Sequence, residues 1–405
     1  MQPENIRVYN FQFWILCFSS FLFFSSFNMI IPELPGYLTS LGGADYKGFI
    51  IALFTLTAGF SRPFSGKLAD KVGRIPVMIL GAIISFIAAL FYPFLLTVGG
   101  FLVLRFMHGF STGFMPTGVS AYVADIVPSH RRGEAMGILG LSTSMGMAMG
   151  PAVGSYIASS FSLYTMFYTS SCVALLSIMI LAGMRETLKV KQSFHISLLK
   201  ISWKDVYEKR VLPPSLLMML TVFSFGIILT IVPDFSEHLG IKNKGLFFLV
   251  FTISSLAIRL IAGKASDKYG RIIILKISCI ILALAMVLTG IATSAPVFLA
   301  AAVIFGVGVG MNSPTVFAWT IDLSDDKHRG RAMATMYIAL EIGIGTGALF
   351  SGFLYDNDAR MFHYSFWSGA ILAIVAFIYL QFFLPAQIIY QDQHRMVPDK
   401  KLTQP

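Results

Sequence analysis

The acidic residue best placed for chemistry is Glu341, which lies in the apolar run 332–355 with no Lys or Arg within one helical turn. An apolar environment favours the neutral form of a carboxyl group, so this side chain can take up and release a proton. We expect Glu341 to carry a proton or to balance the charge of a cationic substrate. A glutamate that is merely tolerated at this position is the weaker alternative.

A basic residue in another apolar run is the next candidate. Arg105 lies in the run 99–124 and is followed by His108 and Gly109. If that run crosses a bilayer, burying the charge costs at least ~2.5–3.5 kcal/mol, so Arg105 needs a partner or a watery cavity. Glu341 would be that partner if the two runs meet. Alternatively, Arg105 lies nearer an interface and extends its charge into water, and His108 is equally well explained as a packing residue.

Two further acidic residues follow prolines near the ends of apolar runs. Glu33 follows Pro32, and Asp234 follows Pro233. Either carboxylate could attract cations or gate an entrance, and a solvated helix end explains both at least as well. Three polar or aromatic residues in the apolar runs are weaker candidates to line a cavity: Asn28, Asn312 and Trp319.

The composition identifies the solvent around these residues. The chain has 405 residues, of which 56% are hydrophobic and 12% charged, and its mean hydropathy is +0.75. Soluble domains carry about 25% charged residues, and so apolar a chain has too little polar surface to face water. A soluble enzyme and a disordered chain are therefore excluded, and a lipid bilayer is implied. A membrane enzyme also fits poorly, because the sequence has no nucleophile–base constellation, no metal-binding cluster and no phosphate loop.

Twelve apolar runs are long enough to cross a bilayer as helices, which takes about 20 apolar residues each. We therefore expect an all-α polytopic membrane protein with 12 transmembrane helices, located in the inner cell membrane with both termini in the cytoplasm. In that topology most Lys and Arg residues fall on the cytoplasmic side. The net charge of +10 then indicates topology and attraction to anionic lipid rather than a nucleic-acid partner. The runs are 11–35, 48–66, 75–96, 99–124, 134–158, 164–184, 213–235, 245–263, 272–293, 295–321, 332–355 and 363–385.

The sequence repeats itself across its two halves. The ten residues Gly66–Ile75 recur as Gly263–Ile272, 197 positions later. The same spacing relates Arg62 to Arg259, Asp125 to Asp322 and Gly146 to Gly343. A constant spacing over so many positions indicates two halves of six helices in the same orientation, as in transporters with parallel repeats. We expect an N-terminal six-helix bundle over 1–184, a cytoplasmic linker over 185–212, a C-terminal six-helix bundle over 213–385 and a cytoplasmic tail over 386–405.

The repeated segment carries both flexibility and charge. Gly66 and Gly73 permit a tight turn and a close helix approach, while Asp70 and Arg74 can pair across the turn. The segment resembles the signature loop of the major facilitator superfamily. That resemblance implies that Asp70 and Arg74 hold a cytoplasmic gate, whereas a plain tight turn is less favoured because both halves repeat the segment. The second copy supplies Gly263, Asp267, Gly270 and Arg271.

A glycine series marks the run 134–158. Three of its glycines recur every four residues and so line one helix face, where another backbone can come close, and Pro151 bends the helix by removing one hydrogen bond. The spacing resembles the antiporter motif of the twelve-span drug/proton exporters, although Ser155 replaces its final glycine. The second half has Ala348 where the proline would stand, so the motif is confined to the first half. Its residues are Gly137, Gly146, Gly150, Pro151 and Gly154.

The resemblance covers essentially the whole chain. The superfamily's second motif has an arginine associated with proton coupling, which Arg105 matches, and His108 stands where that motif has glutamine. The resemblance implies the superfamily fold and alternating access around a midplane site, with Glu33 and Asp234 near the outer mouth. We therefore expect a monomeric transporter that exports a small amphipathic or hydrophobic compound, driven by the proton gradient and without a cofactor. The alternatives are a proton symporter that imports a sugar, organic acid or peptide, and a membrane sensor or scaffold that transports nothing.

Overall fold

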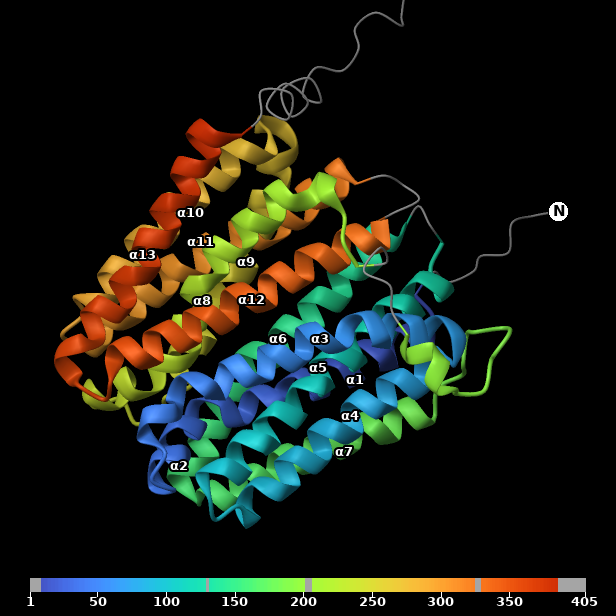
Figure 1. The fold of residues 1–405 in the computed structure, drawn as a ribbon, viewed down its shortest axis with the longest axis horizontal. Coiled ribbons are helices and arrows are strands. Elements are labelled where there is room, and N and C mark those ends of the chain that lie inside the picture. Colours follow the sequence, from blue (N-terminus) through green and yellow to red (C-terminus); the bar gives the residue numbers. More distant parts are fainter. Residues whose placement is uncertain (1–8, 129–130, 201–205, 325–328, 385–405) are drawn as a thin grey trace, which may run out of the picture. The chain divides into compact units, whose positions relative to one another are not determined.

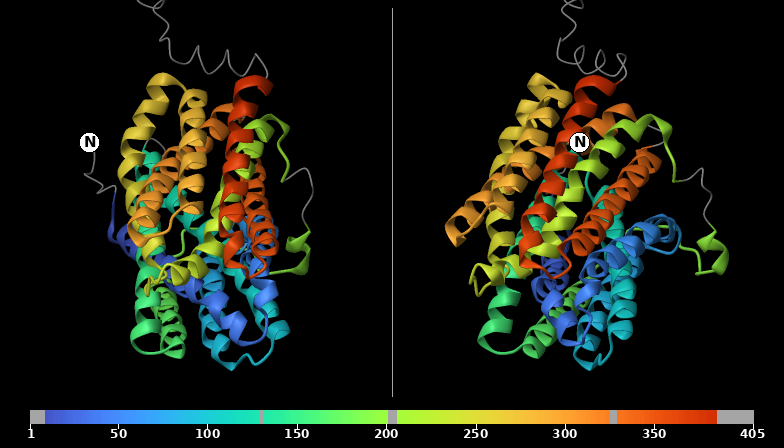
Figure 2. Two further views of the ribbon diagram at one scale, coloured as in Figure 1. Left: turned by 90° about the vertical axis from the view of Figure 1, so that its left-hand side faces the viewer. Right: turned by 60° about the vertical axis from the view of Figure 1, so that its left-hand side comes forward.

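The computed structural model describes residues 9–128, 131–200, 206–324 and 329–384, and within these ranges the chain forms helices and turns without β-strands (Figure 1). The chain divides into two compact units. The first comprises Met1–Asp205 with Lys242–Leu249, and the second comprises Val206–Ile241 with Val250–Pro405. Within each unit the long helices pack side by side, as the two turned views show (Figure 2).

The described part of the first unit contains α1 (Phe11–Ile30), α2 (Leu34–Ser40), α3 (Lys47–Lys71), α4 (Arg74–Phe91), α5 (Val98–Ile126), α6 (Arg132–Ser160) and α7 (Leu163–Ala182). Side-chain oxygens of Asn10, Thr97 and Ser162 accept backbone N–H groups at the starts of α1, α5 and α7, which satisfies donors that a helix start leaves unpaired. In this unit α1 packs against α6 and α7, α3 against α5, and α4 against α5 and α7.

The second unit contains α8 (Leu212–His238), most of α9 (Leu246–Tyr269), α10 (Arg271–Gly290), α11 (Ala295–Leu323), α12 (Arg329–Tyr355) and α13 (Phe362–Ile378). Here α8 packs against α12 and α13, and α10 packs against α11 and α13. These pairs correspond to α1 with α6 and α7, and to α4 with α5 and α7, in the first unit. The sequence repeat is therefore also a repeat of helix packing inside each unit.

Not every long helix is apolar enough to be recognised as a membrane span. Nine helices in the described part of the chain meet the length and hydropathy expected of a span, and α9, which is bent by 45°, makes up to ten. Helices α3 and α5 are outside this set. They contain Arg62 and Arg105 and many glycine, serine and threonine residues, which lower the hydropathy of a helix. The number of 12 spans stays a prediction.

The run 11–35 lies within one candidate membrane span, Phe11–Ser40, whose helix type changes along its length. Helix α1 ends at Ile30, and a 3-10 turn over Ile31–Glu33 leads into α2. Pro32 and Pro35 lie at the break, where the missing N–H groups of proline interrupt helical hydrogen bonding. Glu33 is therefore held at a break between two helices.

The segment predicted as a linker is attached to both units. Its first part belongs to the first unit, where the N–H of Gln192 donates to the carbonyl oxygen of Lys71 at 2.8 Å. Its last part belongs to the second unit, where Glu208 forms an ion pair with Arg331 of α12. Residues 201–205 and the predicted tail 386–405 lie outside the described residues.

Candidate functional site

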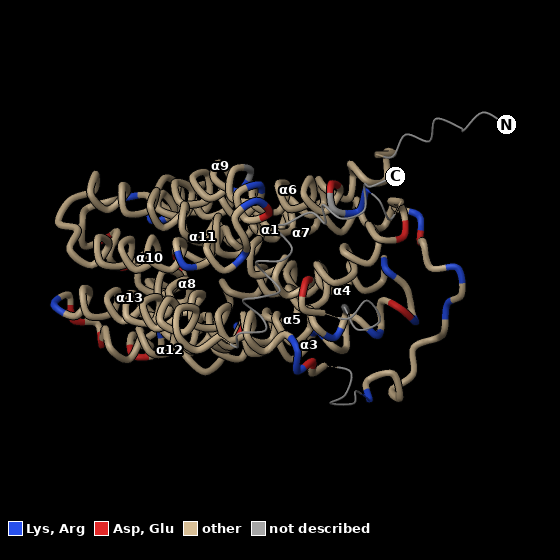
Figure 3. Tube along the Cα trace, turned by 90° about the horizontal axis from the view of Figure 1, so that it is seen from above, with Lys and Arg blue, Asp and Glu red and all other residues tan. Residues whose placement is uncertain are grey.

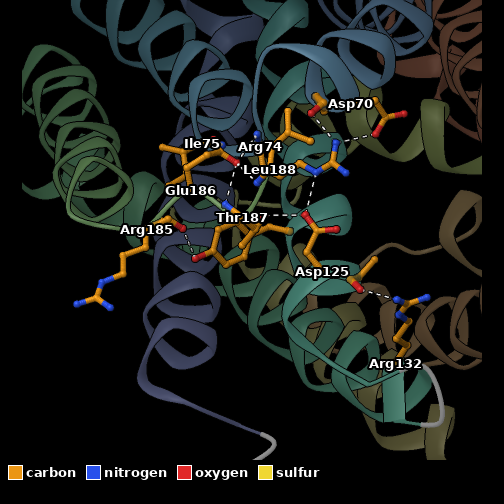
Figure 4. Close-up of polar contacts among 12 residues, drawn as sticks. Asp70, Arg74, Ile75, Asp125, Arg132, Arg185, Glu186, Thr187 and Leu188 are labelled. Atoms are coloured by element: carbon orange, nitrogen blue, oxygen red, sulfur yellow. Dashed lines mark hydrogen bonds and ion pairs between the residues drawn. The ribbon is translucent and has the colours of Figure 1, made fainter. Parts of the chain in front are cut away.

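The first signature segment forms an ion-pair network around Arg74, the first residue of α4 (Figure 4). Nη1 of Arg74 lies 2.6 Å from Oδ1 of Asp70, and its Nε lies 3.1 Å from Oδ2 of Asp125 on α5. Asp125 also accepts a hydrogen bond from Oγ1 of Thr187 at 2.6 Å. The predicted pairing of Asp70 with Arg74 is confirmed, and the network joins the ends of α3, α4 and α5.

The second signature segment repeats this geometry. Nη1 of Arg271 lies 2.5 Å from Oδ1 of Asp267, and its Nε lies 3.1 Å from Oδ2 of Asp322 on α11. Nη1 of Arg271 also donates to Oγ of Ser266 at 2.8 Å. Each half thus holds one arginine between two carboxylates. One carboxylate comes from the preceding helix and one from the following helix.

One glycine of each segment makes the turn. Gly73 has a φ of 146° and Gly270 a φ of 94°, which glycine adopts readily because it has no Cβ. Gly66 and Gly263 lie inside α3 and α9, and a Cβ at either would meet nothing within 4 Å. The close helix approach expected at Gly66 is therefore wrong. Because α3 and α9 continue past these glycines, the turn is shorter than the repeated segment.

Glu186, which the sequence analysis did not single out, caps the start of α4 (Figure 4). Its Oε1 accepts the N–H of Arg74 and its Oε2 accepts the N–H of Ile75, both at 3.1 Å. A carboxylate at this place satisfies unpaired N–H groups and interacts favourably with the helix dipole. A Cβ at Gly73 would lie 2.6 Å from Oε2 of Glu186, so the glycine also makes room for this cap.

Arg105 on α5 is completely buried in the first unit. Its Nε donates to the carbonyl oxygen of Ile50 at 2.7 Å, its Nη1 lies 3.5 Å from Nδ1 of His108, and its Cζ lies 4.3 Å from the centre of the Phe54 ring. Nη2 of Arg105 has no hydrogen-bond partner among the residues that the structure describes. A buried guanidinium held by a carbonyl, a ring and an imidazole, with a donor to spare, can take one more acceptor.

His108 is also completely buried, and its contacts determine its tautomer. Arginine can only donate, so Nδ1 of His108 is an acceptor for Arg105, and it also lies 3.4 Å from the hydroxyl of Tyr92. The ring proton then resides on Nε2, which lies 3.3 Å from Oγ of Ser85. A neutral histidine in this arrangement orients the guanidinium. His108 is therefore a satisfied packing histidine and a contact of Arg105 at the same time.

A second polar cluster lies near the C-terminal end of α6. Oγ of Ser155 donates to Oε1 of Glu33 at 2.6 Å and accepts the backbone N–H of Lys244 at 2.9 Å. Nζ of Lys244 lies 4.0 Å from Oε2 of Glu33, and Nδ2 of Asn243 donates to the carbonyl oxygen of Ala152 at 3.1 Å. We call Glu33, Ser155, Asn243 and Lys244 the Glu33 cluster.

The Glu33 cluster joins α6 to Asn243 and Lys244, which follow α8 in the sequence and belong to the first unit. The first unit includes Lys242–Leu249, and so it also contains the first residues of α9. A Cβ at Gly245 would lie 2.1 Å from the carbonyl oxygen of Pro151, so the two backbones are in direct contact. The docked backbone lies where Pro151 weakens the helical hydrogen bonding of α6.

The comparisons with known proteins agree with this geometry. The sequence profile of the Major Facilitator Superfamily matches residues 16–288 and 215–401. The chain belongs to this superfamily. An uncharacterized MFS-type transporter of Methanocaldococcus jannaschii is 25% identical over 92% of this chain and 98% of its own length. Multidrug resistance protein 1 of Bacillus subtilis is 22% identical over 89% and 92%, and quinolone resistance protein NorA of Staphylococcus aureus is 29% identical over 60% and 66%. The protein is therefore a multi-pass membrane transporter of the superfamily.

Solved structures of the superfamily share the fold. A D-xylose-proton symporter superposes with a TM-score of 0.77 at 19% identity, covering 92% of this chain and 97% of the symporter. The human organic anion transporter MFSD10 superposes with a TM-score of 0.70 at 18% identity, covering 91% and 98%. At such low identity the likeness extends to the fold alone.

The motif glycines of this superfamily member pack on the backbone of α1. A Cβ at Gly146, Gly150 or Gly154 would lie 2.6, 2.6 or 2.0 Å from the carbonyl oxygens of Phe21, Ser25 and Met29, respectively. Both series advance by four residues, so one face of α6 follows one face of α1, and the predicted close approach of another helix backbone to these three glycines is confirmed. Gly137 differs, because nothing lies within 4 Å of a Cβ placed there. Gly343 and Gly347 of α12 repeat the contact on Met219 and Phe223 of α8.

The two acidic candidates of the second unit lie on different helices, Glu341 on α12 and Asp234 on α8. Glu341 lies in the middle of α12 and is buried, with 8% of its surface exposed. Asp234, near the end of α8, interacts with the hydroxyl of Tyr355 at the end of α12. The predicted pair of Arg105 and Glu341 joins residues of different units and stays a prediction.

The weaker cavity candidates take part in helix packing. Nδ2 of Asn28 donates to the carbonyl oxygen of Phe24 within α1 at 2.8 Å. Asn312 accepts a hydrogen bond from Thr221 and donates one to Ser278, both at 3.1 Å, and so joins α8, α10 and α11. The third candidate, Trp319, is buried in the hydrophobic core of the second unit. These contacts give all three residues a structural role, and their predicted role in a cavity is not tested by them.

Proposed function

We propose that this transporter exports small amphipathic or hydrophobic compounds in exchange for protons by alternating access. The observation that carries the proposal is the contact of α6 with α1. Three glycines at four-residue spacing, with Pro151 among them, lie on the α1 backbone in the first half. The second half keeps Gly343 and Gly347 but has Ala348 at the proline position. Both halves share the glycine spacing and the close packing, and the proline that completes the antiporter-type motif occurs only in the half where the exporters carry it.

Two buried ionisable residues would couple transport to protons. Glu341 is buried in the middle of α12, where the neutral carboxyl group is favoured and a proton can be held until the site meets water. Nη2 of Arg105 has no hydrogen-bond partner in the described part of the chain. A carboxylate that has lost its proton would be attracted to this guanidinium, whereas a protonated one would not, so the charge state of the acid would bias the conformational equilibrium.

The proposed substrate class rests on the relatives and on composition. Relatives over most of the chain are named for multidrug resistance and for quinolone resistance. The chain holds 37 Phe and 20 Met, side chains that can repack around varied apolar ligands. We therefore expect fluoroquinolones and lipophilic dyes to be better substrates than sugars.

Flux in proteoliposomes tests the proposal. The purified protein is reconstituted with either a fluoroquinolone or a lipophilic cationic dye enclosed, and a proton gradient is imposed in each direction. Export predicts that the compound moves against the imposed proton flow and that a protonophore abolishes the movement. Uptake of xylose together with protons, without movement of either compound, would favour a symporter. Saturable binding without any flux would favour a sensor, and either result would overturn the proposal.

A further inference from the structure

A stretch after α7 combines exposed charge with exposed apolar surface. Leu188–Lys200 contains three Lys and one His but no Asp or Glu, and all three Lys are exposed. Four hydrophobic side chains of the same stretch are exposed as well, Val190 by 79%, Phe194 by 55%, Ile196 by 78% and Leu199 by 39%. The stretch leaves the helices as a separate excursion, light green in Figures 1 and 2, and its lysines are among the blue positions in Figure 3.

The stretch is held to the first unit from one side. The N–H of Gln192 donates to the carbonyl oxygen of Lys71 at 2.8 Å, and Nζ of Lys67 donates to the carbonyl oxygen of Lys200 at 2.7 Å. Leu198 packs against a small hydrophobic cluster formed by the end of α3, the start of α4 and Phe110 and Phe114 of α5. Backbone groups of Gln192 and Lys200 and the Leu198 side chain therefore attach the stretch, while its other four apolar side chains stay exposed.

The attachment lies next to the start of a candidate membrane span. The candidate membrane span of α4 begins at Arg74, next to the turn that follows α3. The contacts on α3 run from Lys67 to Lys71, which is about 6 Å of helix. The headgroup layer on each side of the hydrocarbon is also about 5–8 Å thick. A segment attached here can reach headgroups without leaving the protein.

We propose that Leu188–Lys200 is an interfacial segment that binds anionic phospholipids. Its exposed apolar side chains enter the boundary between headgroups and acyl chains, and its lysines contact lipid phosphates. Amphipathic helices that combine lysine with apolar side chains lie in this plane, and Leu188–Lys200 exposes the same two kinds of side chain although only Ile196–Leu199 forms a 3-10 turn. Anionic lipid attracts basic residues close to a membrane helix, and the segment contains no acidic residue to oppose that attraction. The predicted cytoplasmic location puts the segment on the leaflet where anionic lipids are common.

A spin label at Phe194 tests this assignment in the full-length protein. The three native cysteines are replaced by alanine, Phe194→Cys is labelled with a nitroxide, and the protein is reconstituted into vesicles of phosphatidylcholine with or without phosphatidylglycerol. Phe94 provides a matched control label. It is also an exposed phenylalanine in a helix connection, by 64%, but no charged residue occurs between Arg74 and Arg105.

We expect dissolved oxygen, which is concentrated in the bilayer, to relax the label at position 194 more efficiently than a water-soluble nickel complex does. This preference should rise severalfold when phosphatidylglycerol is present. It should fall in high salt, which screens the lysines, and in the variant Lys189→Gln/Lys191→Gln/Lys200→Gln. The control label at position 94 should respond to none of these changes. Three results would overturn the proposal. The nickel complex could relax the label at 194 in every membrane, the relaxation could be unaffected by lipid charge and by the lysine substitutions, or neither reagent could reach the label. The last result would indicate a protein partner or a second copy of the chain.

Discussion

Oγ of Ser155 lies 2.6 Å from Oε1 of Glu33, although the two residues are 122 positions apart in the sequence. The same hydroxyl accepts the backbone N–H of Lys244, so a single side chain ties the break after α1 to the connection between α8 and α9. In the exporter motif that α6 resembles, glycine stands at this position. The serine therefore adds a polar anchor to a helix face that otherwise serves close packing.

Ser155→Gly should release the docked connection while preserving the packing of α6. The variant loses one hydrogen bond to a carboxylate, a contact worth about 1.5–3 kcal/mol, and one to a backbone N–H. A loss of ~1.4 kcal/mol changes an equilibrium tenfold. Trypsin cleavage after Lys242 and Lys244 in detergent should therefore accelerate about tenfold or more, because cleavage requires local opening.

Ser159→Gly is the matched control for this prediction. Ser159 lies one turn further along α6, is exposed, and donates only to the carbonyl oxygen of Tyr156. The Ser159→Gly variant places a glycine in the same helix at the same cost, but it removes no contact of the Glu33 cluster. Equal cleavage rates in the two variants would show that the Ser155 hydroxyl does not hold the connection.

Gly154→Ala and Gly137→Ala should have effects of opposite sign. A Cβ at Gly154 would lie 2.0 Å from the carbonyl oxygen of Met29, so α1 and α6 must separate, and overpacking of this kind costs about 1–3 kcal/mol. Gly137 has open space, and alanine is favoured over glycine in a helix by up to ~1 kcal/mol. Melting in detergent, followed by size-exclusion chromatography after heating, should show a lower midpoint for Gly154→Ala only. A lowered midpoint for both variants would contradict the assignment of the contact face.

His108→Gln should be tolerated, whereas His108→Leu should not. Glutamine offers an acceptor for Arg105 and a donor for Ser85, as the neutral histidine does. Leucine leaves Nη1 of Arg105 and the hydroxyl of Tyr92 without this partner, and each unsatisfied buried group costs about 1–3 kcal/mol. Thermal midpoint and drug flux measured on both variants check this. If the leucine variant keeps its stability and its flux, the histidine does not position Arg105.

Asp125→Asn should destabilise the protein more than Asp70→Asn, although both carboxylates contact Arg74. The side chain of Asp70 is 68% exposed and that of Asp125 is 30% exposed, so solvent screens the Asp70 pair more strongly. Asp125 also accepts from Thr187. We expect Asp70→Asn to insert normally and to turn over more slowly, and Asp125→Asn to lower the thermal midpoint as well.

Full transport activity of Asp70→Asn would show that the signature segment is a structural turn without the predicted gating role. The second half provides an independent repetition of the experiment, because Asp267 and Asp322 are 70% and 18% exposed beside Arg271. The same order of effects is expected there. An inverted order in both halves would contradict the argument from screening.

The contacts that could be predicted from the sequence are those between residues a few positions apart in one segment. Asp70 and Arg74 are four residues apart at a helix junction, so their pairing follows from local geometry, and the repeat spacing also relates Asp125 to Asp322. The role of Asp125 could have been inferred from that spacing, since it repeats together with Arg74. Glu186 could not, because its partners are 112 and 111 positions away and no repeat marks it.

The sequence was least informative about which motif glycines contact a neighbouring helix, because a glycine with a neighbour and one without occur in the same kind of motif. Gly66, Gly137 and Gly154 are all helical glycines of recognised motifs, but only Gly154 touches another backbone. The difference depends on which helix face meets a neighbour, and that is decided by tertiary packing. The Glu33 cluster is of the same kind, because its members come from three separate parts of the chain.

Glu341→Gln should abolish proton-driven transport while leaving the fold intact. The amide has nearly the shape of the protonated acid but cannot release a proton, so the variant should still exchange unlabelled for labelled drug without a gradient. Its drug flux should no longer respond to an imposed proton gradient or to pH. Glutamine has nearly the volume of the buried glutamic acid side chain, and substitutions that conserve volume are tolerated best, so we expect the thermal midpoint to change little.

Glu237→Gln is the control for this substitution, since Glu237 is an exposed acid at the end of α8. It makes the same change of charge and volume outside the buried part of the unit and should keep gradient-driven flux. Normal rates and an unchanged pH dependence in Glu341→Gln would remove this carboxyl group from the mechanism. Loss of exchange as well as of gradient-driven flux would instead assign Glu341 to substrate binding, because a group that only carries protons is not needed when drug replaces drug.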